Sequence, residues 1–271
     1  MREGDFFSPA LIENHKAMRM KTKNNPGSSG SSAKGMALVL LTLALLVSVV
    51  SVLADPTAVS SITNLRNATI AATAGLKVNE SQGGGYIYVV SLNATSQNPR
   101  WKAYVGNVTG TYVLQDASGN RIYDWSMTDI EGEVYATRKT TSVSWSNIAC
   151  ATNEQLELEN VALSHNSSSD NITSTFKSTN HTLFYVGSKM FNTNACNYSL
   201  YTYINSTAQT TYFDEIALHD GANMVYAAMI EDPEGGFDLA KYHFQMLVPE
   251  VGSQGWSSST PYYFYVELSA S

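Results

Sequence analysis

Nine asparagines stand in Asn-x-Ser/Thr triplets without proline at the middle position, which is the acceptor pattern for N-linked glycans. The chain holds 21 Asn, and 56 of its 271 residues are Ser or Thr, so chance alone predicts about four such triplets. The excess favours real acceptors over a by-product of composition, and glycosylated side chains must face solvent. The nine are Asn67, Asn79, Asn93, Asn107, Asn166, Asn171, Asn180, Asn197 and Asn205.

Cysteine chemistry is limited to two residues, Cys150 and Cys196. An even count in a chain with many glycan acceptors indicates an oxidising compartment and one disulfide. Two unpaired, buried thiols are the alternative. A zinc site is not predicted, because no pair of histidines lies nearby.

Common catalytic motifs are absent from the sequence: it contains no HExxH, no GxSxG, no GxxxxGK[ST] and no GxGxxG after a strand. We therefore predict no catalytic residue, no cofactor and a non-enzymatic protein. The histidines beyond residue 54 are expected to have structural or surface roles. They are His165, His181, His219 and His243.

Two groups of acidic residues fall in predicted loops, where carboxylates could bind Ca²⁺. The first comprises Asp124, Asp129, Glu131 and Glu133, and the second comprises Glu231, Asp232, Glu234 and Asp238. Neither has the Asp-x-Asp-x-Asp-Gly spacing of a calcium loop. We predict solvated turn charge and no metal site.

Tryptophan side chains can fill a core or stack on sugar rings. We expect Trp101, Trp125 and Trp145 in the core. Trp256 lies in a polar Gly/Ser loop and is the candidate for sugar stacking.

The cellular location of these residues depends on an uncharged run of nineteen residues, 36–54. As a helix it spans about 28 Å, close to the hydrocarbon thickness of a bilayer. Residues 1–35 hold six Lys or Arg against three Asp or Glu, whereas residues 55–271 hold ten against twenty. With the basic side in the cytoplasm, the pattern predicts a single-pass membrane protein with an extracellular C-terminal domain. So acidic a domain excludes nucleic acid as a partner.

Three interpretations of the apolar segment remain open. It is an uncleaved signal anchor, a secretory signal cleaved between Ala54 and Asp55, or a pilin-type signal cleaved between Gly35 and Met36. The residues around Gly35 resemble the archaeal prepilin site, in which a basic residue and glycine precede the hydrophobic stretch.

The domain organisation follows from these boundaries. Residues 1–35 form a basic, disordered cytoplasmic head, 36–54 a transmembrane helix, and 55–84 a stalk or a helical continuation of the span. Residues 85–271 contain short runs rich in Tyr, Val, Ile, Phe and Trp between turn residues. They predict a mainly β domain, an antiparallel β-sandwich of Ig-like or jelly-roll outline. Expected strands cover 86–92, 101–105, 111–115, 121–125, 133–137, 143–148, 182–186, 198–204, 224–230, 242–248 and 262–268.

Two local signals are more specific. The run 116–120, Asp-Ala-Ser-Gly-Asn, joins two expected strands and predicts a hairpin loop. The run 154–163 alternates like a strand, yet Thr152 and Gln155 have the spacing of a helix cap, so strand and short helix both remain open.

A longer pattern resembles an uncharacterised domain of archaeal cell-surface proteins. It runs W-K-x-Y-x-G-N-V-T-G over 101–110, a strand ending in D-A-S-G-N, then Y-x-W over 123–125 and G-E-V-Y-A over 132–136. The resemblance covers most of residues 85–150. It implies a cell-surface location and a fold type, and it implies no chemistry.

The leading hypothesis is a glycosylated, membrane-anchored structural or adhesive surface protein. Its expected partners are the membrane, through residues 36–54, and copies of itself or surface glycans. The second hypothesis is a pilin-like filament subunit cleaved after Gly35. The third is a carbohydrate-binding or hydrolytic surface domain.

Overall fold

A computed structural model of the chain describes residues 55–67, 91, 93–127, 129–139, 142–166, 169–251 and 259–269. All of these belong to one compact unit, Ser51–Ser271. The predicted cytoplasmic head, the apolar segment 36–54, the expected strand 86–92 and Trp256 lie outside the described residues. Within the part of the chain that is described, no helix is long and apolar enough to cross a bilayer.

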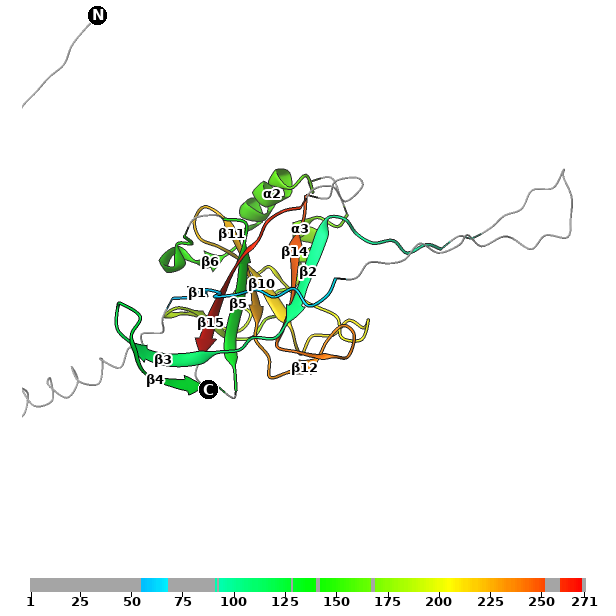
Figure 1. Ribbon diagram of the computed structural model, residues 1–271. Helices are drawn as coiled ribbons and strands as arrows, with labels where there is room; N and C mark the ends of the chain where they lie inside the picture. The colour runs from blue at the N-terminus through cyan, green and yellow to red at the C-terminus, as the bar shows by residue number, and fades with distance from the viewer. Residues whose placement is uncertain are drawn as a thin grey trace, which may run out of the picture. The chain divides into compact units, whose positions relative to one another are not determined.

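An antiparallel, seven-stranded sheet forms the centre of the unit (Figure 1). Its strands lie in the order β1-β15-β5-β11-β10-β6, and β9 also pairs with β10. The bounds are β1 Thr57–Ala58, β5 Glu131–Thr137, β6 Ala149–Cys150, β9 Ser199–Tyr201, β10 Asp214–His219, β11 Met224–Met229 and β15 Tyr263–Ser269.

Both faces of this sheet are covered, because its central strands carry apolar residues at successive positions. All six residues of β11 are buried. Tyr226 packs in the core on one face, whereas Val225 and Ala227 pack in the core on the other. A strand that is buried on both sides reads as a continuous apolar run, which is the pattern of 224–230.

The first face is covered by the two-stranded sheet of β2 (Trp101–Gly106) and β14 (Phe244–Pro249), together with two helices. The helices are α2 (Asn153–Ala162) and α3 (Ile172–Thr175). The second face is covered by the hairpin of β7 (Phe184–Val186) and β8 (Lys189–Phe191) and by the 3-10 turn η1 (Trp145–Asn147). The prediction of a mainly β, antiparallel domain is confirmed, and the packed sheets are consistent with a β-sandwich. Its Ig-like or jelly-roll outline stays a prediction.

Helix α2 settles the alternative left open for 154–163. Gln155 N–H donates to Thr152 Oγ1, and Thr152 N–H donates to Gln155 Oε1 at 2.9 Å, so the capping box is complete. Because the cap satisfies backbone donors that a helix start leaves without partners, it favours a helix over a strand here.

The structure differs from the expected strands at several places. The run 143–148 was expected to be a strand and instead contains η1, after which only β6 pairs with the sheet. Strand β10, which sequence patterns do not indicate, is an interior strand between β11 and the short edge strands, and it begins with two carboxylates. The predicted stalk begins inside the sheet, because β1 pairs with β15 through Thr57 and Val266. A small additional sheet joins β12 (Glu234–Gly235) to β13 (Lys241–Tyr242).

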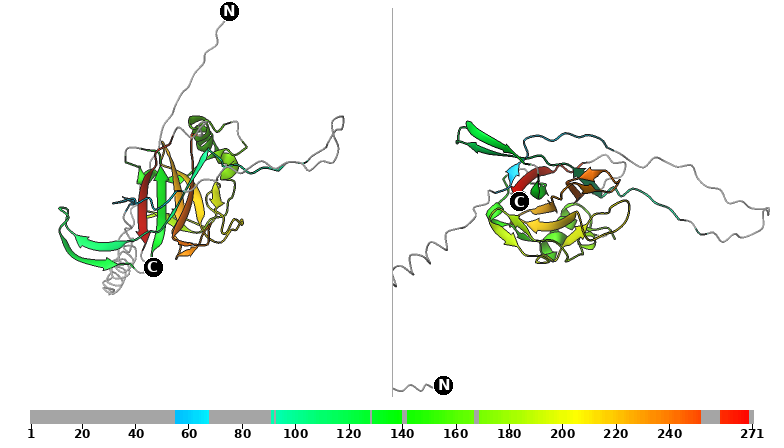
Figure 2. Two further views of the ribbon diagram at one scale, coloured as in Figure 1. Left: turned by 45° about the vertical axis from the view of Figure 1, so that its right-hand side comes forward. Right: turned by 90° about the horizontal axis from the view of Figure 1, so that it is seen from below.

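The predicted hairpin around 116–120 is present. It joins β3 (Thr111–Gln115) to β4 (Arg121–Ser126), and the Asp116 carboxylate accepts from the backbone N–H groups of Ser118 and Asn120. Both views of Figure 2 show this hairpin projecting from the rest of the unit.

Candidate functional site

The glycan acceptors lie mainly on the surface. Of the nine asparagines, Asn79 lies outside the described residues. Seven of the other eight are exposed, in loops that connect the elements on several sides of the unit. Asn171 is the exception, since it is half-buried and its side-chain oxygen accepts from Ser174 N–H at 2.7 Å as the cap of α3.

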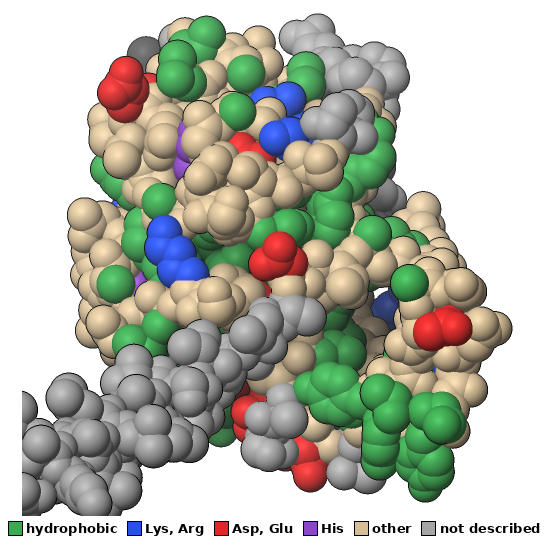
Figure 3. Space-filling model, turned by 90° about the vertical axis from the view of Figure 1, so that its left-hand side faces the viewer, with side chains coloured by type: hydrophobic (Ala, Val, Ile, Leu, Met, Phe, Trp, Pro, Cys, Tyr) green, Lys and Arg blue, Asp and Glu red, His purple; other side chains and the backbone are tan. Residues whose placement is uncertain are grey.

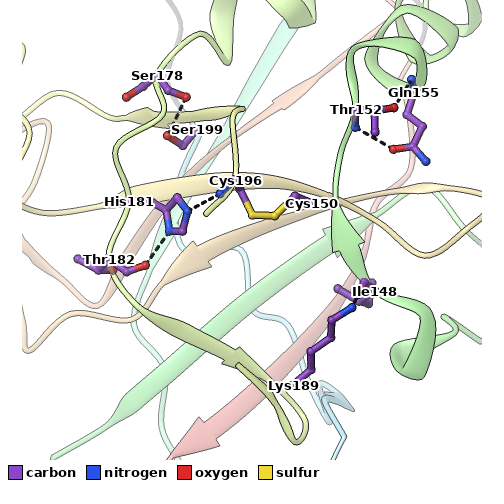
Figure 4. The surroundings of a disulfide bond; sticks show 10 residues. All are labelled: Ile148, Cys150, Thr152, Gln155, Ser178, His181, Thr182, Lys189, Cys196 and Ser199. Carbon is purple, nitrogen blue, oxygen red and sulfur yellow. Dashed lines mark hydrogen bonds between the residues drawn. A yellow bond between two sulfur atoms is a disulfide. The ribbon is translucent and has the colours of Figure 1, made fainter. Parts of the chain in front are cut away.

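The two cysteines form a disulfide (Figure 4). It joins Cys150 of β6 to Cys196 in the loop before β9, with a Cα–Cα distance of 5.2 Å. Cys196 is fully buried, and its backbone N–H donates to His181 Nε2 at 2.9 Å. The bond therefore fastens a loop to the edge of the central sheet, and the disulfide prediction is confirmed.

His181 connects this loop to the next one. Because its Nε2 accepts from Cys196 N–H, the proton of the neutral ring is on Nδ1, which lies 2.7 Å from Thr182 O and donates to it. Thr182 in turn donates through its N–H and its hydroxyl to Asp214 Oδ2. Both ring nitrogens of His181 are thus hydrogen-bonded to backbone groups, so this histidine has a structural role.

The remaining histidines also contact their surroundings closely. His165 is buried, with Nε2 2.6 Å from Glu250 O. Nδ1 of His219 accepts from Gly221 N–H, and Nδ1 of His243 accepts from Val108 N–H. Burial lowers the pKa of His219 and of His243.

The two predicted acidic groups do not come together as groups. Asp124 is exposed on β4, whereas Glu133 is buried in β5. In the second group, Glu231 accepts from Phe213 N–H, and Asp238 pairs with Arg66. Among the residues that the structure describes, no group of three or more His, Cys, Asp or Glu could hold a metal ion.

A different set of carboxylates does come together, and sequence patterns did not indicate it. Glu133 of β5 pairs directly with Glu267 of β15 and with Met229 of β11. The β10–β11 register, continued by one residue, brings Asp214 opposite Met229. Glu133, Asp214 and Glu267 thus lie in one row across four strands, on one face of the sheet. We call them the carboxylate row.

The carboxylate row is buried and only partly hydrogen-bonded. Glu133 and Glu267 are each 4% exposed. Glu133 Oε1 accepts from Tyr185 N–H, and Glu267 Oε2 accepts from Gly187 N–H and from the Tyr135 hydroxyl. The other oxygen of each glutamate, Oε2 of Glu133 and Oε1 of Glu267, has no hydrogen-bond partner among the residues that the structure describes.

This environment favours the neutral carboxyl group. Burial, followed by the proximity of Glu267, raises the pKa of Glu133 to about 8. Burial likewise raises the pKa of Glu267 to about 7. The pair therefore holds protons near neutral pH, but the hairpin β7–β8 covers it, so the row is a proton-binding element of the core and not an open cleft.

The tryptophans divide between the core and the surface. Trp101 packs against the core on one face of the sheet, and Trp145 against Tyr135 and Tyr265 on the other. The expectation that Trp125 lies in the core is wrong, because it is 50% exposed on β4. Among the described strands, β4 pairs with β3 alone, in a separate two-stranded sheet. The proposed sugar-stacking residue, Trp256, lies outside the described residues.

The β3–β4 hairpin has one apolar and one polar face. Tyr112 pairs with Trp125, and Leu114 with Tyr123, so these four side chains share a face. They are 36%, 50%, 56% and 61% exposed, respectively, and the rings of Tyr123 and Trp125 lie 4.9 Å apart. We call these four residues the hairpin face. Hydrophobic side chains gather where the hairpin faces the viewer in Figure 3, at the lower right.

The opposite side of the hairpin is mainly polar, with Thr111 paired to Ser126 and Val113 to Asp124. Such alternation normally covers a core with one face. Here the apolar face is left uncovered by the described residues, and it is the candidate binding surface of the unit.

Comparison with known proteins finds no match: neither a protein family, nor a curated protein, nor a solved structure is similar to this chain. The function must therefore be inferred from the geometry described above.

Proposed function

We propose that the chain is a membrane-anchored surface protein whose β-rich domain faces the cell exterior, carries N-linked glycans, and acts by binding or structural display. The Cys150–Cys196 disulfide carries the proposal, because such bonds persist in oxidising compartments and are rare in the cytosol. The exposure of seven acceptor asparagines supports it from a different observation. The uncharged run 36–54 supplies the anchor.

The non-enzymatic part of the proposal is supported by the burial of the carboxylate row. Glu133 and Glu267 hold protons near neutral pH, yet each is 4% exposed beneath the β7–β8 hairpin. A general acid or base must come within hydrogen-bond reach of its substrate. Carboxyl groups under a packed layer do not meet this requirement.

Glycopeptide mass spectrometry of the protein from its native membranes tests the proposal. We expect glycans on several of the exposed asparagines, such as Asn180, Asn197 and Asn205, and none on Asn171, whose side chain caps α3. Protein made in a cytosol without glycosyltransferases is the control. Unmodified acceptor peptides together with free Cys150 and Cys196 thiols would argue for an intracellular protein.

A filament subunit cleaved after Gly35 is the second candidate. The observation that favours it is the short junction, since only Asp55 and Pro56 separate residue 54 from β1. A helix formed by 36–54 would thus join the β domain directly, as in pilin-like proteins. The mature N-terminus distinguishes the two candidates.

A further inference from the structure

The hairpin face is unusual because the described residues leave most of it uncovered. A two-stranded hairpin is marginally stable alone in water, and it gains stability when its apolar face is covered. The described residues leave Leu114, Tyr123 and Trp125 at least half exposed. Ile122, next to them at the irregularity of the β3–β4 ladder, is 79% exposed. We therefore expect the hairpin face to contact a surface outside the described unit.

The root of the hairpin lies at the C-terminal end of β15. The Tyr112 hydroxyl donates to Leu268 O at 3.2 Å. Gly110, just before β3, packs so closely on this strand that a side chain there would collide with Leu268 Cδ1. The hairpin thus starts from one defined end of the sheet.

The chain enters the unit at the same end. Strand β1 is antiparallel to β15, with Thr57 opposite Val266 and Ala58 opposite Tyr265. Going backwards from Thr57, the chain therefore runs along β15 towards Leu268 (Figure 1). Asp55, the first described residue, follows the uncharged segment 36–54 directly.

We propose that the hairpin face lies in the lipid–water interface of the membrane that holds residues 36–54. This inference rests on the proposed function, and it adds a second membrane contact to the anchor. Trp and Tyr concentrate at this interface because their rings are apolar and their N–H and O–H groups reach water. Leu114 supplies aliphatic surface beside the rings.

The charges of the hairpin agree with this orientation. Asp124 alternates with Tyr123 and Trp125 and so points to the polar face, which would remain in water. The hairpin has two Asp, at 116 and 124, and one Arg, at 121, so attraction to anionic lipid does not hold it. Its contact with the membrane depends on the aromatic and aliphatic side chains, and above all on Trp125.

Quenching of tryptophan fluorescence by lipids with brominated acyl chains measures this contact. The full chain is reconstituted in vesicles of such lipids, and its emission is compared with that of Trp125→Phe. We expect brominated lipid to quench the wild type and Trp125→Phe to lose more than half of the quenched emission. The matched control adds Val113→Trp to Trp125→Phe, which moves the ring to the polar face. This double variant should not restore quenching. Its thermal unfolding should match that of the wild type, which shows that the fold is intact.

Flotation of the vesicles on a density gradient separates the possible outcomes. If the chain floats and Trp125 is quenched, the inference is supported. A chain that floats while Trp125→Phe is quenched as strongly as the wild type overturns the inference and leaves the anchor intact. A third outcome is that the chain floats, Trp125 is not quenched, and crosslinking to a second copy is lost in Trp125→Ser. This result would show that the hairpin face is an interface between copies, and it would also overturn the inference. A chain that does not float overturns the proposed function and the inference together.

Discussion

Replacing Glu133 by Gln should make the protein less sensitive to alkaline pH. In the wild type, the folded state holds a proton on Glu133 up to a pKa of about 8, whereas an unfolded chain releases it near the ordinary value for Glu. The folded state therefore binds more protons between these values. Because stability falls with pH wherever the folded state binds more protons, this contribution is fully present at acid pH and is lost as the pH rises towards 8.

The expected magnitude follows from the number of protons involved. One proton difference changes the free energy of unfolding by about 1.4 kcal/mol per pH unit. Between pH 7 and pH 8 we expect the contribution of Glu133 to fall by about 1 kcal/mol. Glu267 and Glu231, each with a pKa raised to about 7, lose most of their remaining proton in the same interval, and each contributes roughly a third as much as Glu133. His219 and His243, whose pKa values burial lowers, are mainly neutral in both states, so Glu133 makes the largest single contribution in this window.

Urea unfolding with the disulfide intact, at a series of pH values, measures the effect. Glu133→Gln should lose less than half as much stability as the wild type between pH 7 and pH 8, because the amide keeps the acceptor for Tyr185 N–H and cannot ionise. Glu131→Gln is the matched control, since Glu131 lies two residues away on the same strand and is exposed. Equal pH dependence in the wild type and Glu133→Gln would refute the reasoning.

Three further predictions concern stability. Thr152→Ala, which removes the cap of α2, should lower the free energy of unfolding by about 1 kcal/mol. Thr152→Ser keeps the capping hydroxyl and should retain most of the wild-type stability in the same urea assay. Replacing Cys150 and Cys196 by Ser opens a loop with a sequence separation of 46 and should cost up to about 4 kcal/mol, and an unchanged Tm would contradict this. Arg138→Ala leaves the buried Glu159 carboxylate without its bidentate partner and should cost about 3 kcal/mol, whereas Arg138→Met with Glu159→Leu should recover most of this loss.

Features that depend on a few neighbouring residues could be predicted from the sequence. The loop 116–120 carries its own side-chain acceptor, Asp116, and it forms the expected hairpin. The Thr152–Gln155 spacing is likewise local, and it correctly offers a helix as one of two alternatives. The disulfide was predictable because only two cysteines are present.

Features that depend on strand pairing could not be predicted in this way. Strand β10 begins with Asp214 and Glu215, which disfavour a buried strand unless other parts of the fold supply donors. Thr182 and Leu247 supply them here, from 32 positions away in each case. The carboxylate row requires the registers of three separate strand pairs at once.

The place of Trp125 shows the same difficulty. Its alternation with Tyr123 correctly indicates a strand with one apolar face, but alternation does not say whether another layer covers that face. The described structure leaves it open, and the proposed membrane contact gives that exposure a role.

Determination of the mature N-terminus in protein taken from native membranes tests the central claim most directly. A membrane-anchored surface protein predicts that peptides from residues 1–35 are recovered with the membrane-bound chain, joined to the segment 36–54. A chain that starts at Asp55 would contradict anchoring through this segment. A start at Met36 would contradict the anchored form as well, and would favour the filament subunit.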